Sequence, residues 1–345
     1  MIEFRNGDLL KAYTEALVNT VNTVGIMGKG IALQFRQAFP ENYKAYRKAC
    51  QSDQVKLGKM FVFHTGKLTF PKIIINFPTK ADWRSNSRLA DIESGLVDLV
   101  NIITSEKINS IAITPLGCGN GGLDWQVVRP MIVEAFSSLP QCLVIIYAPG
   151  GLPEIDTMTI ATKRPKMTKI RAALLCLMER YQIPDYELSM LEIQKLAYLL
   201  QTAGEPMRLE FEKQQYGPYN ETLHHALQSM DGHYFTGYGD RNSRVAIKLM
   251  HNSIAEAEEY LKNYPETQER LSRVIKLIEG FETPYGIELL ATVHWVGTEN
   301  TESRHNPDAA ISGVHSWNDH KRKTFKPEHI RIAWQRLKEQ GWLNC

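Results

Sequence analysis

Hydrophobic and polar positions in the first 150 residues alternate between strand-like and helix-like patterns. Strand-like runs lie at 16–23, 59–66, 72–78, 110–117 and 143–149, after a short alternating start at 1–7. Helical spacing lies at 30–50, 87–107 and 127–139. Buried strands that alternate with helices predict an α/β domain, a mixed sheet flanked by helices.

The pattern changes after residue 150. Residues 151–168 (GLPEIDTMTIATKRPKMT) show little periodicity. The following segments have mainly helical spacing: 171–181, 189–204, 220–230, 255–264, 267–281, 286–296 and 326–343. A capping box at Ser189 and Glu192 and a cap at Asn220 mark two helix starts, and in the last helix Ile332, Trp334 and Leu337 are expected to pack. The sequence predicts a domain at 1–152, a linker at 153–168 and a mainly helical domain at 169–345.

Composition changes this picture little. A chain of 345 residues, 43% hydrophobic and 23% charged, fits two soluble globular domains. The net charge of +2 does not demand a nucleic-acid partner. We find no N-terminal signal segment and no apolar run near about eighteen residues, so we expect a cytoplasmic protein with no membrane partner.

The cysteine pattern argues against a metal centre. The five cysteines form no CxxC pair, and no HExxH motif occurs. We expect no bound metal and no cofactor.

Two glycine-rich loops carry the first chemical signal. They lie at 19–35 (NTVNTVGIMGKGIALQF) and 115–125 (PLGCGNGGLDW), each after a strand and before a helix. Glycines let backbone N–H groups approach a ligand, and a helix N-terminus attracts phosphate. Neither loop matches a P-loop or a dinucleotide fingerprint. Together they favour a diphosphate ligand at the carboxyl edge of the sheet.

These motifs resemble a known family. The GD at 7–8, the Asn22 loop that runs into GKGIA at 28–32, and GCGNGG at 117–122 resemble a macrodomain, the ADP-ribose-binding α/β fold, over about residues 1–150. The resemblance implies that Asp8 contacts the adenine amino group and that Asn22 lies near the distal ribose. The ADP-ribose-binding set that it implies is Asp8, Leu9, Asn22, Gly28, Gly30, Ile31, Ala32, Gly117, Cys118, Gly119, Asn120, Gly121 and Gly122.

The stretch INFPTKADWR at 75–84 narrows the resemblance. It is similar to the DNA ADP-ribosyl glycohydrolase antitoxins, in which a lysine at this place is catalytic. The resemblance assigns that role to Lys80, which we expect on a turn just past the strand, facing the anomeric carbon of the distal ribose. Related vertebrate-type enzymes carry a second catalytic Asp where this chain has Gly121. Asp124 is left out of the catalytic set.

The residues leave two roles open for Lys80. A neutral amine can attack the anomeric carbon, whereas a protonated amine can assist the leaving base. A free lysine has a pKa of about 10.4, so attack near neutral pH requires a lowered pKa. Trp83 is a candidate base contact, with a packing role as the alternative. Cys118 is interpreted as a small loop residue, because no histidine is placed to activate it.

The second half carries a shorter resemblance. LEIQKLAYLLQ followed by FEKQQYGPYNETL is similar to a helical domain of bacterial antitoxins. It implies that 169–345 binds and inhibits a cognate DNA ADP-ribosyltransferase toxin. The acidic stretches at 209–212 and 256–260 are interpreted as solvated surfaces.

The resemblance as a whole implies an enzyme and antitoxin of a toxin–antitoxin pair. Its substrate would be single-stranded DNA that carries ADP-ribose on thymidine, so that hydrolysis repairs the DNA. Alternatives remain: a hydrolase of ADP-ribose esters on acidic protein side chains, a non-catalytic ADP-ribose-binding module, or an antitoxin that acts only by binding protein.

Overall fold

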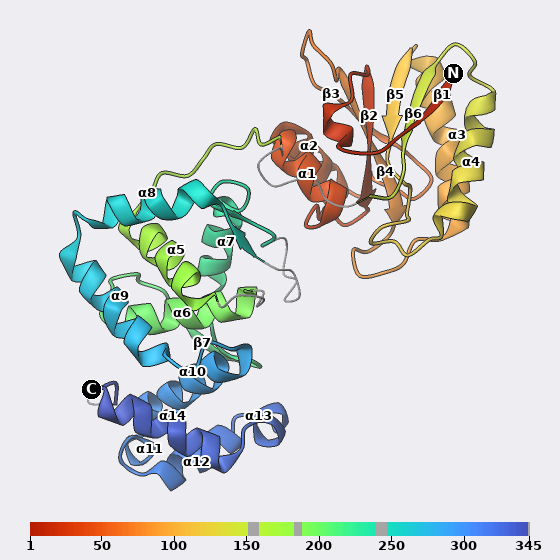
Figure 1. The fold of residues 1–345 in the computed structure, drawn as a ribbon. Helices are drawn as coiled ribbons and strands as arrows, with labels where there is room; N and C mark the ends of the chain where they lie inside the picture. The colour runs from red at the N-terminus through yellow and green to blue at the C-terminus, as the bar shows by residue number, and fades with distance from the viewer. Residues whose placement is uncertain (151–158, 183–187, 239–246, 344–345) are drawn as a thin grey trace. The chain divides into compact units, whose positions relative to one another are not determined.

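The computed structural model describes residues 1–150, 159–182, 188–238 and 247–343 (Figure 1). The chain divides into two compact units, Met1–Lys163 and Arg164–Cys345. Residues 153–158 of the predicted linker lie outside the described residues. The Ala161 N–H donates to the Gln37 carbonyl of the first unit, and the Pro165 carbonyl accepts from the Tyr234 hydroxyl of the second.

The first unit contains a six-stranded mixed sheet. Its strands are β1 (Ile2–Arg5), β2 (Ala16–Asn22), β3 (Phe61–His64), β4 (Ile73–Lys80), β5 (Ser110–Ile113) and β6 (Leu143–Tyr147). Their order is β1-β6-β5-β2-β4-β3, and only β3 runs antiparallel to its neighbour. Both faces are buried, which explains the continuous apolar runs of β2 and β4.

Helices cover the sheet and complete the predicted α/β fold. They are the 3₁₀ helix η1 (Leu9–Lys11), α1 (Gly30–Ala38), α2 (Pro40–Gln51), α3 (Leu89–Ser105) and α4 (Trp125–Ser137). The core against α3 and α4 includes Phe77, Leu96 and Val128. The packing is so close that a methyl group on Gly95 of α3 would lie 2.3 Å from the Phe77 ring. Residues 30–50, one helical run in the sequence, form two helices, because Pro40 begins α2 and restricts Phe39 before it.

The second unit is mainly helical, as the sequence indicates. Its helices are α5 (Lys169–Tyr181), α6 (Met190–Thr202), α7 (Glu221–Met230), α8 (His251–Leu261), α9 (Pro265–Ile278), α10 (Pro284–Glu299), α11 (Thr301–His305), α12 (Pro307–His315), α13 (Asp319–Thr324) and α14 (Pro327–Glu339). Its short strands are β7 (Glu212–Gln214), β8 (Gly217–Tyr219), β9 (Phe235–Thr236) and β10 (Lys248–Leu249). The predicted caps at Glu192 and Asn220 are confirmed.

One packing prediction in α14 is wrong. Trp334 and Leu337 are buried, but Ile332 is 60% exposed and Ile330 takes the core position. The short helices between residues 301 and 324 were not predicted. They are set by caps at Asn300, Asn306 and Asn318 rather than by long apolar periodicity.

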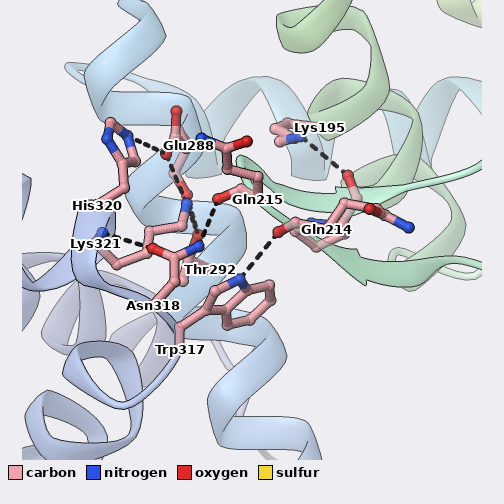
Figure 2. A network of polar contacts seen from close by, with 10 residues as sticks. Lys195, Gln214, Gln215, Glu288, Thr292, Trp317, Asn318, His320 and Lys321 are labelled. Atoms are coloured by element: carbon pink, nitrogen blue, oxygen red, sulfur yellow. Dashed lines mark hydrogen bonds and ion pairs between the residues drawn. The ribbon is translucent and has the colours of Figure 1, made fainter.

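The backbone carbonyls of the hairpin β7–β8 accept hydrogen bonds from side chains of the helical part of the unit (Figure 2). The Lys195 ammonium nitrogen of α6 lies 3.0 Å from the Pro218 carbonyl oxygen. Trp317 and Asn318 donate from the α12–α13 connection to the carbonyls of Gln214 and Gln215, at 2.9 and 3.0 Å. Residues 212–216 are nevertheless exposed, so this hairpin presents its side chains from a fixed backbone.

A buried ion pair lies behind the hairpin. The fully buried Lys321 of α13 donates to the Glu288 carboxylate at 2.6 Å and to the Thr292 hydroxyl at 3.0 Å. Lys195 is 1% exposed and has no carboxylate within ion-pair distance among the described residues. The pKa of Lys195 is lowered to about 7, mainly by burial and also by the Lys321 charge, while Glu288 opposes the shift.

Candidate active site

Lys80 is the last residue of β4, not a turn residue beyond it as the sequence suggested. The strand continues through Pro78 because β4 pairs with β2 up to the cross-strand pair Asn22–Lys80, after an irregularity at Val21. The carboxyl ends of these parallel strands therefore bring the first glycine-rich loop and Lys80 together.

The Lys80 amine is held by two backbone carbonyls. Its nitrogen lies 3.1 Å from the Trp83 oxygen and 2.9 Å from the Asn120 oxygen. One acceptor is on the turn that follows β4, and the other is on the second glycine-rich loop. Burial lowers the pKa of Lys80, the Asp82 carboxylate opposes this shift, and the Lys29 ammonium adds to it.

Ser87 connects the segment after β4 to the second glycine-rich loop. Its N–H donates to the Gly121 carbonyl at 2.9 Å. A methyl group on Gly121 would lie 2.4 Å from both the Ser87 hydroxyl oxygen and the Gly117 carbonyl oxygen. The loop is thus packed so closely that no side chain fits at Gly121, which gives a steric reason for glycine at this position.

The first glycine-rich loop is shaped by the Asn22 side chain. The Asn22 amide nitrogen donates to the Ile26 carbonyl, and its oxygen accepts from the N–H groups of Val24 and Ile26 and from the Tyr46 hydroxyl. Asn22 is 5% exposed. The structure therefore gives it a loop-forming role, and its contact with a ribose stays a prediction.

Both loops present backbone N–H groups without partners among the described residues. In the first loop these groups belong to Gly30, Ile31 and Ala32 at the start of α1, and in the second to Gly119, Asn120 and Gly121. A methyl group on Gly30 would lie 3.2 Å from the Asn120 side-chain nitrogen, so the two loops approach each other closely. Backbone amides of this kind can donate hydrogen bonds to the oxygens of an anion such as a phosphate.

The other predicted residues take varied positions. One Asp8 carboxylate oxygen accepts from the Leu10 N–H at 2.9 Å, and the other is buried without a partner among the described residues. The Leu9 side chain lies in the core. Burial, with a contribution from Asp124, raises the pKa of the Cys118 thiol to about 11, which keeps it protonated. Asp124 caps α4.

The chain was compared with known proteins. The family profile described as Macro domain matches residues 18–132. A protein of Thermus aquaticus named "DNA ADP-ribosyl glycohydrolase" is 45% identical over 343 residues, which cover 99% of this chain and 94% of that protein. The chain belongs to the DNA ADP-ribosyl glycohydrolase family.

Two further matches concern parts of the chain. The solved macrodomain of Mycobacterium tuberculosis DarG is 57% identical, covers 44% of this chain and 99% of that structure, and has a TM-score of 0.43. A Thermosipho africanus protein named "DNA ADP-ribosyl transferase-DNA ADP-ribosyl glycohydrolase fusion protein" is 33% identical over 158 residues, covering 41% of this chain and 40% of that protein.

The family predicted from INFPTKADWR is therefore confirmed, and the glycohydrolase is a hydrolytic enzyme. Sequence reasoning missed two residues of this site: Lys29, whose charge acts on the Lys80 amine, and Ser87, which bonds the second glycine-rich loop. Ser87 gave no signal, because its role depends on a contact with a loop more than thirty positions away in the sequence.

The described residues of this glycohydrolase contain neither a candidate membrane span nor a candidate metal cluster. None of the helices found there is long and apolar enough to cross a membrane. No group of three or more His, Cys, Asp or Glu residues within that part of the chain could hold a metal ion.

Proposed function

We propose that this glycohydrolase removes ADP-ribose from thymidine in single-stranded DNA, with Lys80 as the catalytic residue. The observation that carries the proposal is the position of Lys80. Its amine lies at the end of a central strand, and it is fixed by carbonyls from the adjoining turn and from the second glycine-rich loop. The name of the Thermus relative supports ADP-ribosylated DNA as the class of substrate.

The remaining predicted residues would bind ADP-ribose around this amine. The free amides of the two loops suit the diphosphate. The unpartnered oxygen of Asp8 suits an N–H donor such as the adenine amino group. Leu9 would contribute its backbone only, since its side chain is in the core. Trp83 would contact the modified base.

We assign Lys80 the role of nucleophile. A neutral amine has two N–H groups and one lone pair. With both N–H groups directed at the Trp83 and Asn120 carbonyls, the tetrahedral nitrogen points its lone pair away from them. The amine forms a bond to the anomeric carbon while the bond from that carbon to the base nitrogen breaks, and the proton that the alkylated amine loses passes to the base. Water then releases ADP-ribose and restores the lysine.

The second unit would bind and inhibit a DNA ADP-ribosyltransferase toxin. The fusion protein of Thermosipho, whose name joins the two activities in one chain, supports a functional link between them. The full chain with Lys80→Ala separates the two roles, because it should still inhibit the purified transferase at stoichiometric amounts. Loss of inhibition together with loss of hydrolysis contradicts a separate binding function. The proposed location of both proteins is the cytoplasm.

The decisive test is turnover of an oligonucleotide that carries ADP-ribosylated thymidine. We expect Lys80→Ala to lower the rate at least about 100-fold and to retain ADP-ribose binding in calorimetry. Lys72→Ala is a matched control, since Lys72 precedes β4 at the other end of the strand and is exposed.

Other outcomes would favour the alternatives. Binding of ADP-ribose by the wild type without cleavage of the oligonucleotide contradicts the proposed activity. In that case, release of ADP-ribose from an aspartyl or glutamyl ester would assign the site to modified proteins. No release from either linkage would leave an ADP-ribose-binding module, with the second unit as the carrier of function.

A further inference from the structure

Trp83 and Arg84 form a stacked pair on the turn after β4. The guanidinium carbon of Arg84 lies 4.6 Å from the centre of the Trp83 ring. Arg84 is exposed and Trp83 is half-buried. A cation over an aromatic face gains electrostatic attraction, and the planar guanidinium keeps its donors for other partners.

The turn that carries this pair has a fixed backbone. The Arg84 N–H donates to the Asp82 carboxylate at 2.8 Å, and the Ser85 N–H and hydroxyl both donate to the Asp82 carbonyl, at 3.1 and 2.8 Å. These bonds form a tight Asx-type turn. The pair is therefore held in place before any ligand binds.

The same turn is bonded to the catalytic amine. The Trp83 carbonyl accepts from Lys80 at 3.1 Å. In the proposed reaction, Lys80 faces the carbon at which ADP-ribose ends and the DNA begins. The strand on either side of the modified nucleotide must therefore run close to the turn that carries Trp83 and Arg84.

The Arg84 guanidinium has no carboxylate partner among the described residues, and the nearby Asp82 carboxylate accepts from a backbone N–H instead. By contrast, Arg164, which also lies over an aromatic ring, is paired with Glu256 at 2.6 Å. An exposed, unpaired guanidinium with five N–H donors matches the oxygens of a phosphate.

We propose that Arg84, held on Trp83, binds a phosphate of the DNA strand next to the modified nucleotide and makes the enzyme prefer ADP-ribose on a strand to ADP-ribose on an isolated nucleoside. This inference rests on the proposed function. It adds a specificity-determining residue outside the set that binds ADP-ribose.

The test compares two substrates of one chemistry. The first is an ADP-ribosylated thymidine within an oligonucleotide of about ten nucleotides, and the second is the ADP-ribosylated nucleoside, which has no flanking phosphate. Arg84→Gln should lower kcat/KM about tenfold on the oligonucleotide and leave it within twofold on the nucleoside. The fall of log(kcat/KM) with log salt should become less steep by about 0.7, the loss of one phosphate contact on a single strand.

Two further variants define the contact. Arg84→Lys keeps the charge and should retain the salt dependence, with an intermediate rate. Arg129→Gln is the matched control, because Arg129 also lies exposed over an aromatic ring, that of Phe4 on the edge strand β1. Arg129→Gln should leave kcat/KM unchanged on both substrates. Unchanged ADP-ribose affinity of Arg84→Gln will show that the site is folded.

Distinct results overturn the two proposals. One contrary result is that Arg84→Gln changes kcat/KM equally on both substrates, or on neither, and leaves the salt dependence intact. That result contradicts the phosphate contact, while the glycohydrolase function stands. If the wild type cleaves neither substrate, the proposed function fails and this inference falls with it.

Discussion

Lys195→Met gives the sharpest test of the buried network in the second unit. Lys195 is 1% exposed, and burial lowers its pKa to about 7 from the 10.5 of a solvated lysine. Between these two values, the unfolded chain holds a proton that the folded chain lacks. The free energy of unfolding of the wild type should therefore rise by about 1.4 kcal/mol per pH unit, or about 5 kcal/mol in all.

The methionine variant removes this titration but also one hydrogen bond. The Pro218 carbonyl would lose its donor at 3.0 Å, which costs about 1–3 kcal/mol for a buried acceptor. Below pH 7, Lys195 is protonated in both the folded and the unfolded wild type, so the folded state bears the full cost of burying the charge. Once the lost hydrogen bond is subtracted, the variant should be more stable than the wild type by about 2–4 kcal/mol. At higher pH the order should reverse, with equal stabilities between roughly pH 8 and 10.

The assay is urea unfolding from pH 6 to pH 10, followed by tryptophan fluorescence. In a Trp83→Phe, Trp125→Phe background, the signal comes from the second unit alone, through Trp295, Trp317, Trp334 and Trp342. Leu199→Met is the control, since it changes a buried residue of the same helix that does not titrate. A difference between wild type and Lys195→Met that stays constant over this pH range refutes the reasoning, because it would mean that the folded state keeps the proton.

Two further predictions concern the active site. Gly121→Ala places a methyl group 2.4 Å from the Ser87 hydroxyl oxygen and the Gly117 carbonyl, so overpacking of about 1–3 kcal/mol should weaken ADP-ribose binding roughly tenfold or more. Gly119→Ala, whose methyl group meets no atom within 4 Å, should cost less in the same calorimetric titration; equal losses would show that the contact with Ser87 is unimportant. Lys29→Gln removes a charge that lowers the pKa of Lys80, so the pKa of Lys80 should rise. In a plot of the single-turnover rate against pH, the rising part of the curve should therefore move to higher pH. A rate that instead falls as the pH rises through this range would assign the protonated amine to the reaction.

The sequence was most informative where chemistry and local pattern coincide. Strand–loop–helix alternation and the glycine-rich loops predicted the fold of the first unit, and INFPTKADWR predicted its family. The predicted end of β4 came too early, because Pro78 is a residue typical of turns. In the structure, pairing with β2 keeps the strand extended to Lys80. A strong local signal was overridden by a neighbouring strand.

Residues that act through distant contacts gave no such signal. Ser87 matters through a loop far along the chain, and Lys195 looks like an ordinary helix lysine until the hairpin covers it. Ile332 and Ile330 are both apolar positions in α14, and only the neighbouring helices decide which of the two is buried. Periodicity alone did not make that choice.

Each of the two units has hydrophobic clusters of its own among the described residues. The clusters around Phe77 and Phe35 belong to the first unit, and the cluster around Leu199 and Leu290 belongs to the second. Selection can therefore act on them at different speeds. Under the proposed functions, a second unit that binds a changing protein partner can accumulate substitutions, while the unit that binds a chemically constant nucleotide stays under purifying constraint.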